Sequence, residues 1–348
     1  MNINFSSPIN NTGYGIASFN ILKELIKNNN VSYFPIGGPG VNTQEDYDIV
    51  SKLINNQDDF DVNAPFIKIW HQFDLAQRIG KGKYFAYPFF ELDTLNKREK
   101  KHLSVPDEIF VSSKWAKQVL ENNGIESPIH VIPLGVDLSI FNIPKKNKDD
   151  KYVFLNIGKW ELRKGHDLLP KLLDLAFPNN ENVELWILAP EHTNSYSSKE
   201  EIDQWKNLYK SDRIKIFTGF NTHQEVAELI SKADCGLFPS RAEGWNLELL
   251  ETIVMDKPAI ATNYSAHTEF CNKDNCYLID ITETETAYDG KAFTGQGNWA
   301  KIGQAQIDQT VEFMRLVYQN NIRNNPGAAD TANLFCWKNS SDKILGCI

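Results

Sequence analysis

Short runs of β-branched and aromatic residues alternate along this chain with segments that have helical apolar spacing. Runs such as Tyr152–Ile157 and Ile214–Phe217 have the length of a strand. In the intervening segments, apolar residues such as Ile16, Phe19 and Leu22 recur on one face of a helix. Strands that alternate with helices form parallel sheets covered by helices. The pattern therefore predicts an α/β protein built on doubly wound parallel sheets.

The length of 348 residues exceeds what one typical core holds and suggests about two domains. The segment NIPKKNKDDK, residues 142–151, is polar and charged and separates two strand-helix series. We therefore expect an N-terminal domain over residues 1–146 and a C-terminal domain over residues 147–325. The tail, residues 326–348, offers Trp337, Ile344 and Leu345 for packing. It is predicted to be a helix that packs back on the N-terminal domain.

Composition argues against several classes of protein. A net charge of -9 disfavours broad binding to nucleic acid, which needs clustered positive charge. No apolar run reaches the length of about 18 residues typical of a membrane-spanning helix, and MNINFSSPINNTGYG does not resemble a secretory leader. We expect a cytoplasmic protein. The five cysteines include no C-x2-C pair, which disfavours a disulfide framework or a structural zinc site.

The segment EGWNLELLE, Glu243–Glu251, follows the strand-like CGLFPS and predicts a helix that runs to about Val254. Its two end glutamates lie about 80° apart around an ideal helix, so both could reach one elongated ligand. Unpaired N–H groups at the helix start, together with Gly244, would suit a diphosphate. A solvated acidic helix would show the same pair of glutamates.

The segment GKWELRKGHD directly follows the strand YVFLNI and contains Lys159 and Lys164. Ligands of open parallel sheets bind at the carboxyl ends of the strands, and two cations there would neutralise charge that develops on a leaving diphosphate. A solvated lysine loop is the alternative interpretation.

These stretches resemble the family 4 glycosyltransferases, which are retaining enzymes of the GT-B fold. The resemblance covers NIGKWELRKGHD, the segment from IKIFTGF to MDKPAIAT, EIFVSSKWAKQVLENNGI with IHVIPLGVDLSIF, and the tryptophan-containing tail. It implies two Rossmann-like domains that face a cleft, with a C-terminal helix docking back on the body. It also implies a nucleoside diphosphate sugar as donor.

The resemblance also assigns roles to particular residues. It implies that Lys159 and Lys164 contact the diphosphate, that Glu251 holds the donor ribose hydroxyls, and that Glu243 contacts the transferred sugar. Many relatives carry arginine where Lys159 stands, and lysine offers the phosphate a point charge in place of a planar fork. The resemblance places the donor sugar or phosphate near the backbone groups of Gly244, Trp245, Asn246 and Leu247. It places the base near the backbone of Thr218 and Gly219.

In the N-terminal half, NNTGYGIAS resembles the glycine-rich loop between the first strand and helix. Gly13 and Gly15 would there allow sugar or phosphate to approach the backbone, although a tight turn alone would also explain them. Two residues that follow strands are candidates for the active-site position that many relatives fill with histidine. They are His71 in IKIWHQFD and Glu91 in AYPFFELD. A structural histidine is the alternative for His71.

The sequence therefore predicts transfer of a sugar from a UDP or GDP conjugate to an acceptor hydroxyl, and the resemblance implies retention of anomeric configuration. No Asp-x-Asp pair appears in a matching context, so we expect metal independence and no cofactor. A glycan, lipid-linked sugar, protein or small molecule remains possible as acceptor. The basic segment Asn96–His102 would allow weak peripheral membrane contact or would simply be a solvated helix face. A nucleotide-sugar epimerase, a glycogen-type phosphorylase and a non-catalytic nucleotide-sugar or glycan-binding protein are the alternative functions.

Overall fold

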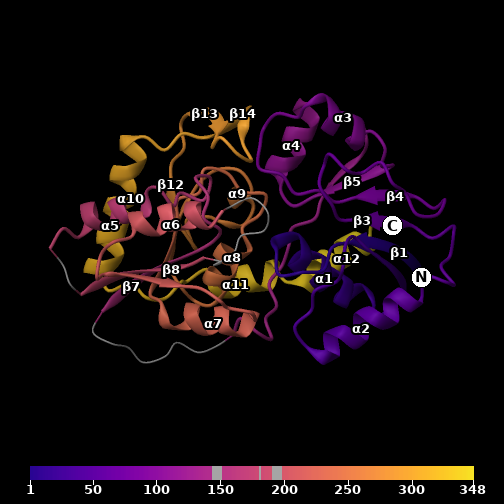
Figure 1. The fold of residues 1–348 in the computed structure, drawn as a ribbon, viewed down its shortest axis with the longest axis horizontal. Coiled ribbons are helices and arrows are strands. Elements are labelled where there is room, and N and C mark those ends of the chain that lie inside the picture. The colour runs from indigo at the N-terminus through magenta and orange to yellow at the C-terminus, as the bar shows by residue number, and fades with distance from the viewer. Residues whose placement is uncertain (143–150, 180–181, 190–197) are drawn as a thin grey trace. The chain divides into compact units, whose positions relative to one another are not determined.

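The computed structural model describes residues 1–142, 151–179, 182–189 and 198–348. They form two compact units, an N-terminal unit of Met1–Asp137 with Phe335–Ile348 and a C-terminal unit of Leu138–Leu334 (Figure 1). The predicted domain boundary between residues 146 and 147 lies outside the described residues. The tail from residue 326 is divided between the units, because its last 14 residues belong to the N-terminal one.

The N-terminal unit is built on a six-stranded parallel sheet with the strand order β2-β1-β3-β4-β5-β6. The strands are β1 (Asn2–Ser7), β2 (Asn30–Pro35), β3 (Phe66–Lys68), β4 (Tyr84–Ala86), β5 (Glu108–Val111) and β6 (Ile129–Val131). The helices are α1 (Gly13–Leu25), α2 (Gln44–Asn55), α3 (Lys97–Leu103), α4 (Lys114–Asn122) and α12 (Trp337–Leu345).

The core of this unit forms where apolar residues of central strands meet the buried faces of helices. Phe66 of β3 and Tyr84 of β4 pack in one cluster with Leu103 of α3 and Leu120 of α4. The central strands are buried, which explains why they read as continuous apolar runs in the sequence.

The final helix, α12, packs against α1 within the N-terminal unit. Val136 pairs with Cys336 in a parallel bridge, and Ser340 Oγ donates to the Pro133 carbonyl at 2.7 Å. A Cβ on Gly135 would lie 2.3 Å from the Cys336 carbonyl carbon, so only glycine fits beside the returning chain.

The C-terminal unit has a second six-stranded parallel sheet, with the order β12-β11-β10-β7-β8-β9. Its strands are β7 (Tyr152–Ile157), β8 (Val183–Leu188), β9 (Ile214–Phe217), β10 (Cys235–Phe238), β11 (Ala259–Thr262) and β12 (Tyr277–Ile279). Its helices are α5 (Leu169–Ala176), α6 (Lys199–Leu208), α7 (His223–Lys232), α8 (Leu247–Val254), α9 (His267–Phe270), α10 (Gln304–Gln319) and α11 (Ala328–Leu334). The predicted α/β fold with two parallel-sheet domains is confirmed.

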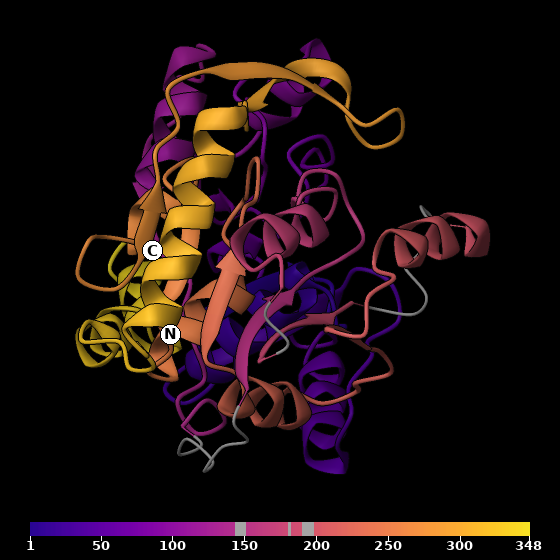
Figure 2. The same cartoon turned by 90° about the vertical axis from the view of Figure 1, so that its left-hand side faces the viewer.

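The strand order of this sheet reverses between β7 and β10. The chain runs outward from β7 through β8 to β9, and then returns to β10 on the other side of β7. Helix α10 packs on α5 and on β11 and β12 (Figure 2). The loops after β7 and β10 therefore emerge side by side at the carboxyl edge, at a topological switch point where open α/β sheets bind ligands.

An antiparallel hairpin of β13 (Thr284–Tyr288) and β14 (Thr294–Ala300) follows β12. Trp299 of β14 is buried, and its indole Nε1 donates to Glu285 at 3.2 Å. The backbone N–H of Ala300 donates to the Arg241 carbonyl at 2.9 Å, which ties the hairpin to the loop after β10.

Candidate functional site

Two loops of the C-terminal unit meet at the switch point, one from Gly158 to Leu168 and one from Pro239 to Asn246. The backbone N–H of Arg241 donates to the Arg163 carbonyl at 2.6 Å. Gly165 has a φ of +78°, and a Cβ there would lie 2.4 Å from the Pro239 carbonyl oxygen. Glycine is therefore required at this crossing, because both the conformation and the contact exclude a side chain.

Glu243 lies at the centre of this contact and forms two ion pairs. Its Oε2 accepts from Arg163 Nη1 at 2.6 Å, and its Oε1 lies 3.1 Å from Lys164 Nζ. The residue is only 4% exposed. Burial by itself would raise the pKa of Glu243, but the charges of Arg163 and Lys164 outweigh it and lower the pKa to about 2. Glu243 is therefore ionised at neutral pH.

The two cations beside Glu243 have different surroundings. Arg163 also donates from Nη1 to the Ala242 carbonyl at 2.7 Å and from Nη2 to Glu161 at 2.7 Å. Lys164 has a second, longer contact, with Glu248 at 3.8 Å. Burial opposes the charge on Lys164, but Glu243 and Glu248 raise its pKa above the ordinary value. Both side chains are therefore charged.

Lys159 and Lys164 do not occupy equivalent positions. Lys159 follows Gly158 at the end of β7 and is exposed, whereas Lys164 is buried. The sequence grouped them as two cations of one loop, and the structure separates an accessible cation from one already paired with a carboxylate.

Glu251 lies on α8, five residues beyond the loop, and its carboxyl makes no hydrogen bond or ion pair with any residue that the structure describes. The residue is 7% exposed. Burial raises the pKa of Glu251 well above the ordinary value, and the nearby charge of Glu248 raises it further. A buried carboxyl without donors is costly to the fold, and ligand-binding sites commonly contain such groups.

The start of α8 is held by Asn246, which has a left-handed φ of 85° and accepts from the Leu249 N–H at 3.2 Å. Its side-chain amide donates to His267 Nε2 at 2.9 Å, while His267 Nδ1 donates to the Thr262 carbonyl at 3.0 Å. Burial lowers the pKa of His267 to about 4, so the imidazole is neutral. Trp245, next in the chain, is buried against Phe270 with ring centroids 4.9 Å apart.

Other predicted backbone positions lie at the same carboxyl edge. Gly244 and Leu247 are buried at the entrance to α8. Thr218 and Gly219 follow the edge strand β9, and a Cβ on Gly219 would meet no atom within 4 Å.

Three residues of this site were not singled out from the sequence: Arg163, Ser265 and His267. Ser265 Oγ accepts from the Glu243 backbone N–H at 2.8 Å. Arg163 is adjacent to Lys164 in the quoted segment, and His267 follows β11 at the carboxyl edge. Their positions after strands were an available signal, but their partners lie 21 to 80 residues away in sequence.

The N-terminal unit brings His71 and Glu91 together around Tyr14. The Tyr14 ring lies 4.6 Å from the His71 ring and 4.8 Å from Phe89, and its hydroxyl donates to the Phe89 carbonyl at 2.8 Å. Burial raises the pKa of Tyr14, and the charge of Glu91 raises it further. His71 also stacks on Phe73 with centroids 5.0 Å apart. These residues follow β1, β3 and β4 at one edge of the sheet.

Gly15 is required by the chain's own packing, and its approach to sugar or phosphate stays a prediction. A Cβ on Gly15 would lie 2.3 Å from both the N and O atoms of Asn10, so the close backbone approach is made by the chain itself. Gly13, the first residue of α1, has open space in front of it.

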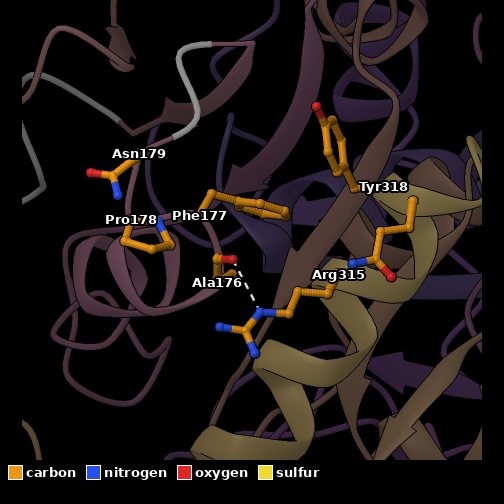
Figure 3. Close-up of a pocket in the computed structure, with 7 residues that line it drawn as sticks. Ala176, Phe177, Pro178, Asn179, Arg315 and Tyr318 are labelled. Carbon is orange, nitrogen blue, oxygen red and sulfur yellow. Dashed lines mark hydrogen bonds between the residues drawn. The ribbon is translucent and has the colours of Figure 1, made fainter.

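A separate pocket of about 300 Å³ lies between the end of α5 and α10 (Figure 3). Arg315 donates to the Ala176 carbonyl at 3.1 Å and to the Leu175 carbonyl at 2.7 Å, and so caps the end of α5. Because α5 ends where the chain returns to the start of β8, this pocket lies at the amino edge of the sheet, opposite the switch point.

Residues 139–290, which include the whole switch-point site, match the family model described as glycosyl transferases group 1. The match covers somewhat less than half of the chain, and it shows what this segment is similar to. The finer assignment to family 4 stays a prediction.

Proteins similar to this chain include the MMP α-(1→4)-mannosyltransferase of Mycolicibacterium hassiacum. The two are 25% identical over 171 residues, which cover 49% of this chain and 40% of the mannosyltransferase. The matched region thus corresponds to less than half of that relative's length.

Solved structures resemble this chain over nearly its whole length. A sucrose-phosphate synthase from Thermosynechococcus elongatus has a TM-score of 0.70 at 14% identity, covering 100% of this chain and 98% of that one. Anabaena HepE in complex with UDP and glucose has a TM-score of 0.69 at 12% identity, with 99% and 98% covered. At such identities the likeness shows the fold, and it confirms the predicted GT-B architecture.

Within the described ranges, no helix is long and apolar enough to cross a membrane. The same residues contain no group of three or more His, Cys, Asp or Glu side chains placed to hold a metal ion.

Proposed function

We propose that this chain transfers a sugar from a UDP or GDP conjugate to an acceptor hydroxyl, with retention of configuration and without a metal ion. The observation that carries the proposal is the pair of buried glutamates at the switch point. Glu243 is ionised between two cations, and Glu251 has no partner among the described residues. A nucleoside diphosphate sugar offers the complementary groups, with hydroxyls at both ends and two anionic phosphates between them.

The donor is proposed to lie along the carboxyl edge of the C-terminal sheet. Glu251 accepts hydrogen bonds from the ribose hydroxyls, and Lys159 and Lys164 contact the diphosphate. N–H groups at the start of α8 add the positive end of the helix dipole. The base lies near Thr218 and Gly219 after β9, which is two strands or about 10 Å from β7. That separation suits the length of a nucleoside diphosphate.

The chemical step breaks the bond between the anomeric carbon and the diphosphate oxygen. Negative charge then develops on the leaving diphosphate, where Lys164, Lys159 and the helix N–H groups stabilise it electrostatically. Glu243 contacts the transferred sugar as a carboxylate, accepting hydrogen bonds from its hydroxyls. The acceptor oxygen attacks the anomeric carbon on the same face as the departing oxygen and forms the new glycosidic bond, which retains the configuration, while the hydroxyl proton passes to the departing diphosphate oxygen.

The acceptor is proposed to contact the N-terminal unit near His71 and Glu91. Both residues lie close to Tyr14 at one edge of that unit's sheet. Proteins similar to this chain support the general reaction, since HepE was solved in complex with UDP and glucose and another is named as a mannosyltransferase. Glycans, lipid-linked sugars, proteins and small molecules all carry a suitable hydroxyl.

Weak peripheral membrane contact is a further part of the proposal. Helix α3 exposes Lys97, Arg98, Lys100 and Lys101, while Glu99 and Leu103 face the protein. Each cation near an anionic surface contributes about 1 kcal/mol. Co-sedimentation with vesicles containing anionic lipid should therefore exceed that with neutral vesicles, and the difference should disappear when all four cations are replaced by glutamine. Equal co-sedimentation with both vesicle types would leave α3 as a solvated helix.

The first test of the donor site is isothermal titration of UDP, GDP, ADP and their sugar conjugates against the wild type and Glu251→Ala. Glu312→Ala, an exposed glutamate on α10, is the matched control. We expect one nucleotide series to bind the wild type and the control equally and Glu251→Ala at least about tenfold more weakly. If no nucleotide binds the wild type, the proposed function is wrong.

Turnover is tested separately with the donor that binds, by measuring nucleoside diphosphate release with and without acceptors. Epimerisation of the donor sugar without an acceptor would replace the transferase proposal with an epimerase. Tight donor binding with neither transfer nor hydrolysis would indicate a non-catalytic binding protein.

A further inference from the structure

Arg163 and Lys164 are neighbours in sequence and both contact Glu243, but their contacts differ in kind. Arg163 Nη1 donates to Glu243 and to the Ala242 carbonyl, while Nε and Nη2 donate to Glu161 at 3.1 and 2.7 Å. Its guanidinium is therefore fixed on three sides. Among the described residues, the Lys164 ammonium forms ion pairs with two carboxylates, those of Glu243 at 3.1 Å and Glu248 at 3.8 Å.

The backbone of Arg163 is also fixed, because its carbonyl accepts from the Arg241 N–H at 2.6 Å. The Arg241 guanidinium donates two hydrogen bonds of 2.8 Å to the Asp167 carboxylate. Both ends of the arginine are thus held by the loop after β10. The flexible stem of Lys164 has no comparable anchor on its ammonium group, so Lys164 can change partners while Arg163 stays in place.

Glu243 needs a counter-ion whatever Lys164 does. A carboxylate as buried as this one is strongly unfavourable when its last partner leaves. If Lys164 were the sole counter-ion, turning its ammonium toward a phosphate would leave the Glu243 carboxylate buried and unpaired. That unfavourable free energy would weaken donor binding. Arg163 removes this conflict because its bond to the other carboxylate oxygen persists.

We propose that Arg163 is a positioning residue that serves as the permanent counter-ion of Glu243 and so releases Lys164 to bind the diphosphate of the donor. The proposal rests on the proposed function. It assigns Arg163 no direct contact with the donor, because its donors are directed at protein oxygens. Arg163 acts through Lys164 and Glu243.

The test is the affinity for the nucleoside diphosphate that binds the wild type, measured by calorimetry in a double-mutant cycle. Arg163→Gln should weaken binding at least about tenfold, because Lys164 then stays with Glu243. Arg163→Lys, which keeps a cation at this position, should weaken binding less than Arg163→Gln does. In a Lys164→Met background the same Arg163→Gln change should alter affinity by less than about twofold, since no lysine remains to be released.

A second cycle addresses folding and a purely structural role. Arg163→Gln combined with Glu243→Gln removes the stranded charge, so this double variant should fold and should recover most of the lost affinity for the diphosphate. Circular dichroism and thermal melting confirm the fold of each variant. If Arg163 had only a structural role, the affinity losses caused by Arg163→Gln and Glu243→Gln would instead add.

Three results would overturn the inference while leaving the proposed function intact. They are unchanged affinity in Arg163→Gln, an equal loss with and without Lys164, and no recovery in the Arg163→Gln/Glu243→Gln variant. The second would mean that Arg163 attracts the diphosphate directly. Absence of any nucleotide binding in the wild type would remove the proposed function, and the inference with it.

Discussion

The buried carboxyl of Glu251 predicts that donor affinity depends on pH. In the ligand-free protein, burial and the charge of Glu248 raise its pKa, so the neutral acid is favoured. If the ribose hydroxyls donate to the carboxylate, donor binding stabilises the ionised form and lowers that pKa. Affinity should therefore rise with pH between the bound-state and free-state pKa values of Glu251, and level off above the higher one.

The magnitude follows from proton linkage. Between the two pKa values one proton is released on binding, so affinity rises about tenfold per pH unit, or about 1.4 kcal/mol. The buried groups Glu243 and His267 do not interfere, because their pKa values are about 2 and about 4, respectively. A nucleoside diphosphate sugar is the ligand of choice, since its diester phosphates do not titrate near neutrality.

The assay is calorimetric titration from pH 5 to 8, in pairs of buffers with different ionisation enthalpies, so that proton release is measured directly. Glu251→Gln keeps the shape and removes the titration, and should bind with a flat profile. Glu312→Gln, an exposed control, should behave as the wild type. An affinity that falls as pH rises, or a slope that persists in Glu251→Gln, would refute the assigned role.

The same carboxyl has a consequence for the ligand-free fold. A raised pKa means that the stability contributed by the neutral acid is present below the unfolded-state pKa and is lost as pH rises toward the folded-state value. Glu251→Gln should therefore melt at a higher temperature than the wild type at pH 8, with the gap closing toward pH 4.5. A gap that is independent of pH would contradict this explanation.

The remaining predictions concern neighbouring features of the site. Lys164→Met should reduce kcat/KM about a hundredfold, whereas Lys159→Met, at an exposed position, should reduce it less. Equal reductions in kcat/KM would show that burial does not distinguish the roles of the two lysines. Gly165→Ala should cost about 3 kcal/mol in chemical denaturation, because of its φ and the Pro239 oxygen. Gly219→Ala, which has a similar φ of +75° but open space, should cost about 1 kcal/mol. Transfer activity should be the same in EDTA as in buffer without added metal. A loss in EDTA that magnesium reverses would contradict metal independence.

Much of the fold was readable from the sequence because local periodicity reflects local burial. The strands Tyr152–Ile157 and Ile214–Phe217 have the bounds that their apolar runs indicate, and the helix ending at Val254 begins just inside the Glu243–Glu251 segment. The pattern did not single out the hairpin of β13 and β14. Strand β13 is largely polar and exposed, and β14 is polar or glycine until its last two residues, which are buried, so neither shows the alternation that burial of one face imposes.

The sequence by itself also determined which residue types follow the strands of the C-terminal sheet, and hence that two lysines and two glutamates belong to its carboxyl edge. Only the tertiary structure decided how they pair. The ion pair between Arg163 and Glu243 joins positions 80 residues apart, and it forms because the strand order places the loops after β7 and β10 side by side. Spacing along the chain encodes periodicity and local conformation, but it carries no record of strand order. Whether a buried cation is fixed on protein oxygens, as Arg163 is, or is able to change partners therefore depends on contacts that only folding creates.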